Sequence, residues 1–172
     1  GNVMKFNMGP LGPQIMTQID RYQTAFVCVT GGEPLAQPHC IELLQQLVLK
    51  YNAVSIETSG ALSIERVPEQ VMVVMDIKTP GSGELEKMLW ANLDRLKPKD
   101  QIKFVIRDEA DYQWAVQWIK KHQPLNTQNI WFSPVYETLP PRQLAEWIIR
   151  DQCAVRLQTQ LHKTLWGDVQ GK

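Results

Sequence analysis

The chain has 172 residues, long enough for one domain with a sizeable core, and its 18 basic and 18 acidic side chains cancel to a net charge of zero. Balanced charge argues against a direct nucleic-acid partner, because such binding rests on clustered lysine and arginine. No apolar run approaches the roughly 20 residues that a membrane helix needs, and no signal segment begins the chain, so we expect a cytoplasmic protein without membrane association.

The first half of the chain alternates short apolar runs with helical patterns. The apolar runs are typical of buried parallel strands. Strands are predicted at residues 25–29, 53–58 and 71–76, and helices over 11–22, 38–48 and 84–96. The helix over 84–96 is indicated by Leu85, Met88, Leu89 and Leu93, which recur at helical spacing.

The second half continues the alternation. Strands are predicted at residues 101–106, 129–132 and 154–157. One helix is expected to begin near Asp108, a good N-cap type, and to end before Pro124. Another is expected to begin at Pro140 and Pro141.

This alternation predicts an α/β fold with a parallel sheet, in units of roughly 25–30 residues. A complete eight-unit barrel needs about 250 residues. We therefore expect residues 1–172 to form a single domain, an incomplete, open TIM-like βα barrel. Ligands bind such folds at the rim where the strands end.

Polar residues follow several predicted strands at this rim. The groups are Thr30–Glu33, Glu57–Gly60, Asp76–Lys78, Ser133 and Gln158–His162. Each group alone fits turn or cap chemistry. Because all of them fall at strand carboxyl ends, together they predict a cleft.

The segment Thr30-Gly31-Gly32-Glu33-Pro34 is the most informative of these groups. Two glycines at a strand end leave backbone N–H and C=O groups bare, so a ligand can approach closely. Glu33 then places a carboxylate where it can hold an ammonium group of that ligand.

Five segments in fixed order carry a family resemblance. They are residues 30–34 (TGGEP), 56–60 (IETSG), 76–84 (DIKTPGSGE), 101–106 (QIKFVI) and the tail from Leu157 to Gly171. From about Ala25 onward the chain resembles the 7-carboxy-7-deazaguanine synthase family of the radical S-adenosylmethionine superfamily.

The resemblance implies binding residues for S-adenosylmethionine. Gly31, Gly32 and Glu33 match positions that hold the methionine amino group. Positions that touch the ribose and the carboxylate match Ser59, Asp76, Ile77 and Lys78, and those near the adenine match Ser133, Pro134, Val135 and Tyr136. For the pterin-derived substrate it implies Thr30, and in the tail Gln160 and His162.

The resemblance also implies an enzyme and its reaction. Similar enzymes are homodimeric carbon–nitrogen lyases that use S-adenosylmethionine, a [4Fe–4S] cluster and Mg²⁺. They convert 6-carboxy-5,6,7,8-tetrahydropterin into 7-carboxy-7-deazaguanine by radical ring contraction with loss of ammonia, in queuosine and other deazapurine biosynthesis. The cofactor supplies the radical chemistry, and the protein positions the reacting molecules and shields them.

The cysteines depart from the family pattern. The superfamily's CxxxCxxC triplet precedes the Gly-Gly-Glu segment, but residues 1–29 contain only Cys28, and Cys40 and Cys153 lie far along the chain. Cluster ligation needs thiolates at fixed short intervals, so we expect no cluster here. Cys28 and Cys153 are expected to be buried and inert, and Cys40 to be a small apolar helix residue. The family's magnesium-ligand threonine beside the triplet is also absent.

Two explanations of this departure remain open. The chain is either a truncated form that lacks the first strand and the cluster loop, which we favour, or a degenerate paralogue. Loss of a first strand is expected to expose an apolar sheet edge and to invite dimerisation. As written, the chain alone is expected to be inactive and to supply no catalytic residue.

Two other functions compete with the synthase. Glycyl-radical-enzyme activases are similar around the Gly-Gly-Glu segment and the Asp-x-Lys segment at Asp76, but the tail from Gln160 to Gly167 favours the synthase. A non-catalytic scaffold that binds S-adenosylmethionine without turnover is the alternative from another class, and the missing cysteines support it.

Overall fold

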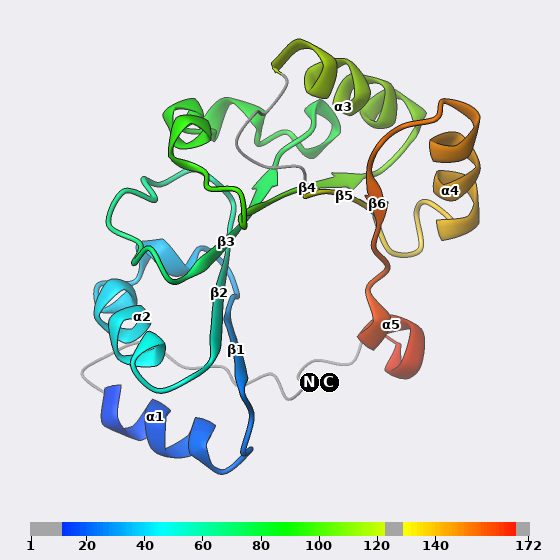
Figure 1. Ribbon diagram of the computed structural model, residues 1–172. Helices are drawn as coiled ribbons and strands as arrows, with labels where there is room; N and C mark the ends of the chain where they lie inside the picture. The colour runs from blue at the N-terminus through cyan, green and yellow to red at the C-terminus, as the bar shows by residue number, and fades with distance from the viewer. Residues whose placement is uncertain (1–11, 123–128, 168–172) are drawn as a thin grey trace.

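Six parallel strands form one curved sheet in the computed structural model, which describes residues 12–122 and 129–167 (Figure 1). The strands are β1 (Phe26–Val29), β2 (Ala53–Thr58), β3 (Met72–Ile77), β4 (Gln101–Ile106), β5 (Ile130–Pro134) and β6 (Arg156–Leu157). Each strand pairs with the next one along the chain, and β1 and β6 do not pair with each other. The predicted open α/β barrel is therefore confirmed.

Helices cover the outer side of the curved sheet. They are α1 (Gly12–Asp20), α2 (Cys40–Val48), α3 (Glu109–His122) and α4 (Pro141–Arg150), while α5 (Leu161–Trp166) follows β6. Figure 1 shows α2, α3 and α4 on the convex side and the strands lining the concave side. In the described part of the chain, no helix combines the length and the apolar character that a membrane span requires.

The hydrophobic core lies between the sheet and these helices. Strand side chains alternate in direction, and in β3 and β4 every second residue faces the helices and is fully buried. The Phe104 ring lies edge-on to Phe132 and to Trp118 of α3, with ring centroids 5.6 and 5.5 Å apart. The concave face is consequently left to the other half of the strand residues, many of them polar.

The prediction of a helix over residues 84–96 is wrong. This segment forms two 3₁₀ turns, η3 (Leu85–Lys87) and η4 (Trp90–Arg95). Its backbone makes short-range bonds of the 3₁₀ type, such as Asn92 amide to Leu89 carbonyl, and it also bonds to the loop after β2, because the Leu89 amide donates to the Gly60 carbonyl. Buried Asn92 binds the same loop with its side chain. Tertiary contacts therefore override the helical spacing of the leucines.

Several element boundaries also differ from prediction. β5 continues through Ser133 and Pro134, β6 is only two residues long, and α5 was not predicted. Cys28 is exposed and Cys153 is half-buried, so the expectation that both are buried is wrong. Cys28 lies on β1, which among the described strands pairs only with β2. Phe26 on the same strand is 73% exposed.

Candidate functional site

Two adjoining cavities lie at the carboxyl ends of the strands. The first, of about 100 Å³, is lined by Thr30, Gly32, Glu57, Thr58, Ser59, Val74, Asp76, Lys78 and Lys103. The second, of about 170 Å³, is lined by Asp76, Ile77, Lys78, Thr79, Gly81, Ser82, Val105, Arg107, Asp111 and Val135. The structure thus brings together three of the polar groups picked out in the sequence, those after β1, β2 and β3.

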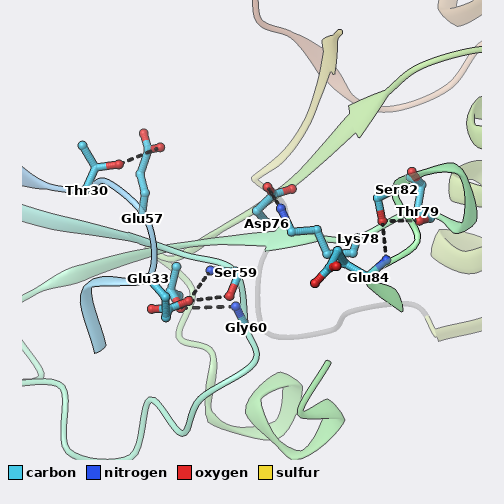
Figure 2. A network of polar contacts seen from close by, with 11 residues as sticks. Thr30, Glu33, Glu57, Ser59, Gly60, Asp76, Lys78, Thr79, Ser82 and Glu84 are labelled. Carbon is cyan, nitrogen blue, oxygen red and sulfur yellow. Dashed lines mark hydrogen bonds and ion pairs between the residues drawn. The ribbon is translucent and has the colours of Figure 1, made fainter. Parts of the chain in front are cut away.

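Glu33 fastens the segment after β1 to the end of β2 (Figure 2). The Thr58 hydroxyl donates to its carboxylate at 2.9 Å, and the Ser59 amide and hydroxyl donate to Oε2 at 2.8 and 2.5 Å. The Leu35 amide donates to Oε1 at 3.1 Å, which makes Glu33 the N-cap of the turn η1 (Pro34–Ala36). These donors occupy the four lone-pair positions of the carboxylate.

Gly31 and Gly32 lie directly before Glu33, and their backbone is open to the surrounding space. Their φ angles of +103° and +55° lie where side chains are rarely tolerated. A Cβ built on either glycine has no atom within 4 Å, so the space above the backbone is empty. Beside them the Thr30 hydroxyl donates to Glu57 Oε2 at 3.5 Å. The segment therefore exposes unshielded peptide groups to the first cavity.

Asp76 and Lys78 stand between the two cavities and line both. The Lys78 ammonium donates to Asp76 Oδ2 at 2.7 Å, and both side chains are about a quarter exposed (Figure 2). Asp76 Oδ1 is buried and has no hydrogen-bond partner among the described residues. Ile77 between them is fully buried in the core, so it can meet a ligand only through its backbone.

The wall of the second cavity comes partly from α3. Asp111 is 2% exposed, and its Oδ1 accepts from the Gly81 amide at 2.9 Å. The Arg107 guanidinium donates to the Gly81 carbonyl at 3.1 Å. Asp111 and Arg107 thereby hold the loop that follows Lys78. Sequence reasoning missed Asp111, because only the fold brings a first-turn helix residue under this loop.

The predicted adenine segment runs along the second cavity only in part. Ser133 is fully buried, and its hydroxyl has no partner among the described residues. Val135 lines the second cavity, and its amide donates to the Ile106 carbonyl at 2.8 Å. Pro134 ends β5, and the Tyr136 ring faces Lys163 of α5, whose ammonium lies 4.8 Å from the ring centroid.

The two substrate residues predicted in the tail belong to the start of α5. Gln160 is the N-cap of α5 and lines neither cavity. His162 belongs to α5, but its side chain lies outside the described part of the structure. Thr30 borders the first cavity, and Gln160 does not.

The residues present do not fit an iron–sulfur cluster. Cys28 is exposed on β1, Cys40 is buried in α2 and Cys153 follows α4. Burial raises the pKa of the Cys40 thiol to about 11, which favours the protonated form over the thiolate that metals bind. Among the side chains that the structure describes, no three of His, Cys, Asp or Glu converge as a metal site.

Comparison with known proteins gives strong sequence relatives, although no family model matches the chain. It is 41% identical over 157 residues to the 7-carboxy-7-deazaguanine synthase of Chlorobaculum tepidum, covering 90% of this chain and 71% of the relative. The synthase of Koribacter versatilis is 38% identical, with 80% and 67% covered. That of Methanospirillum hungatei is also 38% identical, with 80% and 57% covered.

Solved structures share the fold. The crystal structure of QueE from Escherichia coli matches 87% of this chain with a TM-score of 0.67 at 22% identity, and the match spans 63% of that chain. Streptococcus suis SuiB bound to S-adenosylmethionine matches 85% of this chain with a TM-score of 0.58 at 13% identity, spanning 40% of SuiB. At these identities the structures establish the architecture, and the sequence relatives carry the family assignment.

Proposed function

The chain belongs to the 7-carboxy-7-deazaguanine synthase family, and on that premise we propose that it forms the S-adenosylmethionine- and pterin-binding part of a radical carbon–nitrogen lyase. The proposed reaction is the ring contraction of 6-carboxy-5,6,7,8-tetrahydropterin to 7-carboxy-7-deazaguanine. The observation that carries the proposal is the open Gly31-Gly32 backbone clamped by Glu33 at the rim of the first cavity.

The site fits S-adenosylmethionine. Its ammonium group needs acceptors, and the bare peptide carbonyls around Gly31 and Gly32 supply them within the reach that the empty space allows. Glu33 has its lone pairs filled by Thr58, Ser59 and Leu35, so we assign it the part of fixing these carbonyls in place and of adding negative charge behind them. The cofactor supplies the radical chemistry once bound.

The nucleoside end of the cofactor fits the second cavity. The partnerless Asp76 Oδ1 is an acceptor suited to a ribose hydroxyl. Val135, which the resemblance assigns to the adenine, lines the second cavity. Ser133 of the same segment has a buried hydroxyl without a partner among the described residues. We assign Thr30 to the pterin from its place in the first cavity, and Gln160 and His162 from the family resemblance alone.

The 172 residues by themselves are proposed to bind but not to turn over. None of the cysteine positions fits a cluster, so no step of the reaction is assigned to residues of this chain. What this chain contributes is binding, orientation and exclusion of water from the two cavities.

Calorimetric titration with S-adenosylmethionine tests the proposal. We expect saturable binding that is lost when Gly32 is replaced by Val, since a β-branched side chain suits neither a φ of +55° nor the open approach. Gly83→Ala, at a positive φ on the surface loop, is the control for backbone strain. A folded wild-type chain that does not bind S-adenosylmethionine contradicts the proposal.

A non-catalytic scaffold is the second candidate, favoured by the absence of a cysteine triplet from the sequence. Anaerobic reconstitution with iron and sulfide separates the two on this chain. Uptake of four irons with cleavage of S-adenosylmethionine means that the chain is itself catalytic. Binding without iron uptake leaves turnover to residues that this chain does not contain.

We extend the proposal to a homodimer in the cytoplasm. The resemblance is the basis for both. The exposed Phe26 on β1, a strand that pairs with β2 alone, adds an apolar surface suited to self-association. Light scattering coupled to size exclusion is the test, and a monomer at micromolar concentration contradicts the dimer.

A further inference from the structure

One row of side chains crosses the concave face of the sheet just below the rim. The register pairs Asp76 of β3 with Lys103 of β4, Lys103 with Trp131 of β5, and Trp131 with Arg156 of β6. The next residue along β4, Phe104, faces the opposite side and packs against α3. Alternation along the strands therefore places the whole row on the concave face.

Two lysines border the first cavity, and their surroundings differ. The Lys78 ammonium is paired with Asp76 at 2.7 Å. Lys103 makes no hydrogen bond or ion pair with any residue that the structure describes, although Asp76 is its neighbour in register. The other carboxylate lining the cavity, that of Glu57, accepts from Thr30. Lys103 is thus a half-buried positive charge at the cavity without a partner.

The neighbour of Lys103 on the other side is a donor that also lacks a partner. The Trp131 indole Nε1 is buried and has no acceptor among the residues described. Arg156 lies over the Trp131 ring, 5.2 Å from its centroid, and adds a second positive charge to the row. Trp131 lines neither cavity, and it is the register that places it beside Lys103. Buried donors are almost always satisfied in native proteins, so the unpaired indole N–H and the ammonium on the neighbouring strand together indicate an anionic ligand.

The charge of the surroundings limits the kind of anion. Glu57 lies in the wall of the same cavity, and its carboxylate repels a doubly charged group such as a phosphate more strongly than a singly charged one. A carboxylate has two acceptor oxygens, which match one ammonium and one N–H donor on adjacent strands.

We propose that Lys103, assisted by the Trp131 indole, binds a ligand carboxylate on the concave face of the sheet. This inference rests on the proposed function, which offers two sources: the methionine carboxylate of S-adenosylmethionine and the 6-carboxylate of the pterin. Lys78, already neutralised by Asp76, then orients that aspartate and is not the main carboxylate ligand.

Calorimetry with two matched ligand pairs tests the inference on the full 172-residue chain. The pairs are S-adenosylmethionine with its decarboxylated form, and pterin-6-carboxylate with 6-hydroxymethylpterin. We expect the wild type to prefer the carboxylated member of at least one pair by about tenfold to a hundredfold, as charged hydrogen bonds do. Lys103→Met abolishes that preference by weakening only the carboxylated ligand, and Lys103→Arg keeps part of it.

Two further variants make the outcomes decisive. Lys120→Met removes an exposed lysine of α3 and is expected to retain the full preference for the carboxylated ligand. Lys103→Gln is measured together with Lys103→Met in case the apolar side chain impairs folding. The ligand pair whose preference depends on Lys103 identifies the source of the carboxylate. A folded Lys103 variant that keeps the wild-type preference in both pairs overturns the inference, as does a wild type that binds these ligands without preference. Binding of none of the four ligands overturns the proposed function, and this inference with it.

Discussion

Ser59 donates both its backbone amide and its hydroxyl to Glu33 Oε2, at 2.8 and 2.5 Å, although 26 residues separate the two in sequence. The contact joins the ends of the neighbouring strands β1 and β2. It also fixes the direction of the peptide groups at Gly31 and Gly32, because Glu33 follows them directly. Glu33, which the sequence predicted to contact a ligand, thus anchors the segment that the ligand approaches.

Glu33→Gln is expected to lower both stability and affinity. The amide nitrogen that replaces one oxygen can accept nothing from Ser59 or Thr58, so at least one donor in a partly buried place loses its partner. Urea unfolding is expected to show a loss of about 1–3 kcal/mol. Calorimetry is expected to show weaker S-adenosylmethionine binding, since the carbonyls of Gly31 and Gly32 are less well fixed.

Glu42→Gln is the matched control for this change. Glu42 is exposed on α2 and pairs with His39 at 2.6 Å, so its replacement is expected to shift stability by no more than about 0.5 kcal/mol. Equal losses for the two variants would show that the effect at Glu33 is one of net charge and not of its hydrogen bonds.

Much of the fold was accessible from the sequence because its signal is local. Strands β2 and β4 appear as apolar runs bounded by turns, and their parallel order follows from the alternation with helices. The segment 84–96 shows where local reasoning fails. Its leucines have helical spacing, but Asn92 and Leu89 give their hydrogen bonds to the loop 60–64, a partner that no sequence window contains.

The candidate site likewise contains some residues that the sequence identifies and others that only the packed structure identifies. Gly31 and Gly32 are recognisable because they come just after a strand, and Asp76 because it is a polar residue at the end of an apolar one. Lys103 and Trp131 lie within strands, and their importance depends on which face of the sheet they occupy and on what lies beside them in register. Asp111 depends on how α3 docks beneath the loop at Gly81. These placements are properties of the packed molecule.

Asn92→Ala is expected to destabilise the protein strongly without touching either cavity. The Asn92 side chain is fully buried, donates to the carbonyls of Gly60 and Leu62 at 3.1 and 2.8 Å and accepts from the Ile64 amide at 3.1 Å. Its removal takes the side-chain partner from the Leu62 carbonyl and the Ile64 amide, while the Gly60 carbonyl keeps the Leu89 amide, for an expected loss of about 2–4 kcal/mol in urea unfolding. The exposed Asn52→Ala is the comparison, expected within about 0.5 kcal/mol of wild type. Similar losses in both variants would rule out the role of Asn92.

Gly60→Ala and Gly83→Ala form a matched pair at nearly equal φ angles of +74° and +70°. A Cβ at Gly60 meets Met88 at 2.8 Å and Met75 at 3.1 Å, whereas one at Gly83 meets nothing within 4 Å. Backbone strain alone is expected to cost about 1 kcal/mol at either site, and overpacking adds about 1–3 kcal/mol at Gly60 only. Thermal and urea unfolding measure the difference. Equal effects would mean that the two methionines move aside without cost.

Asp151→Asn is expected to change the acid limb of the stability profile. Two hydrogen bonds from Arg150, at 2.8 and 3.0 Å, lower the pKa of Asp151 from 3.8 to about 2. A carboxyl with a lowered pKa in the folded state stabilises the protein above the unfolded value and loses this contribution as the pH falls through the folded value. The wild type is therefore expected to exceed Asp151→Asn in urea midpoint at pH 5–7, with the difference shrinking between pH 4 and 2.

Asp94→Asn, which removes an exposed carboxylate of η4 with no hydrogen bond in the described structure, controls for net charge. The same pH dependence in the control would assign the effect to overall charge, and a difference that persists at pH 2 would show that Arg150 does not act through the ionised form of Asp151.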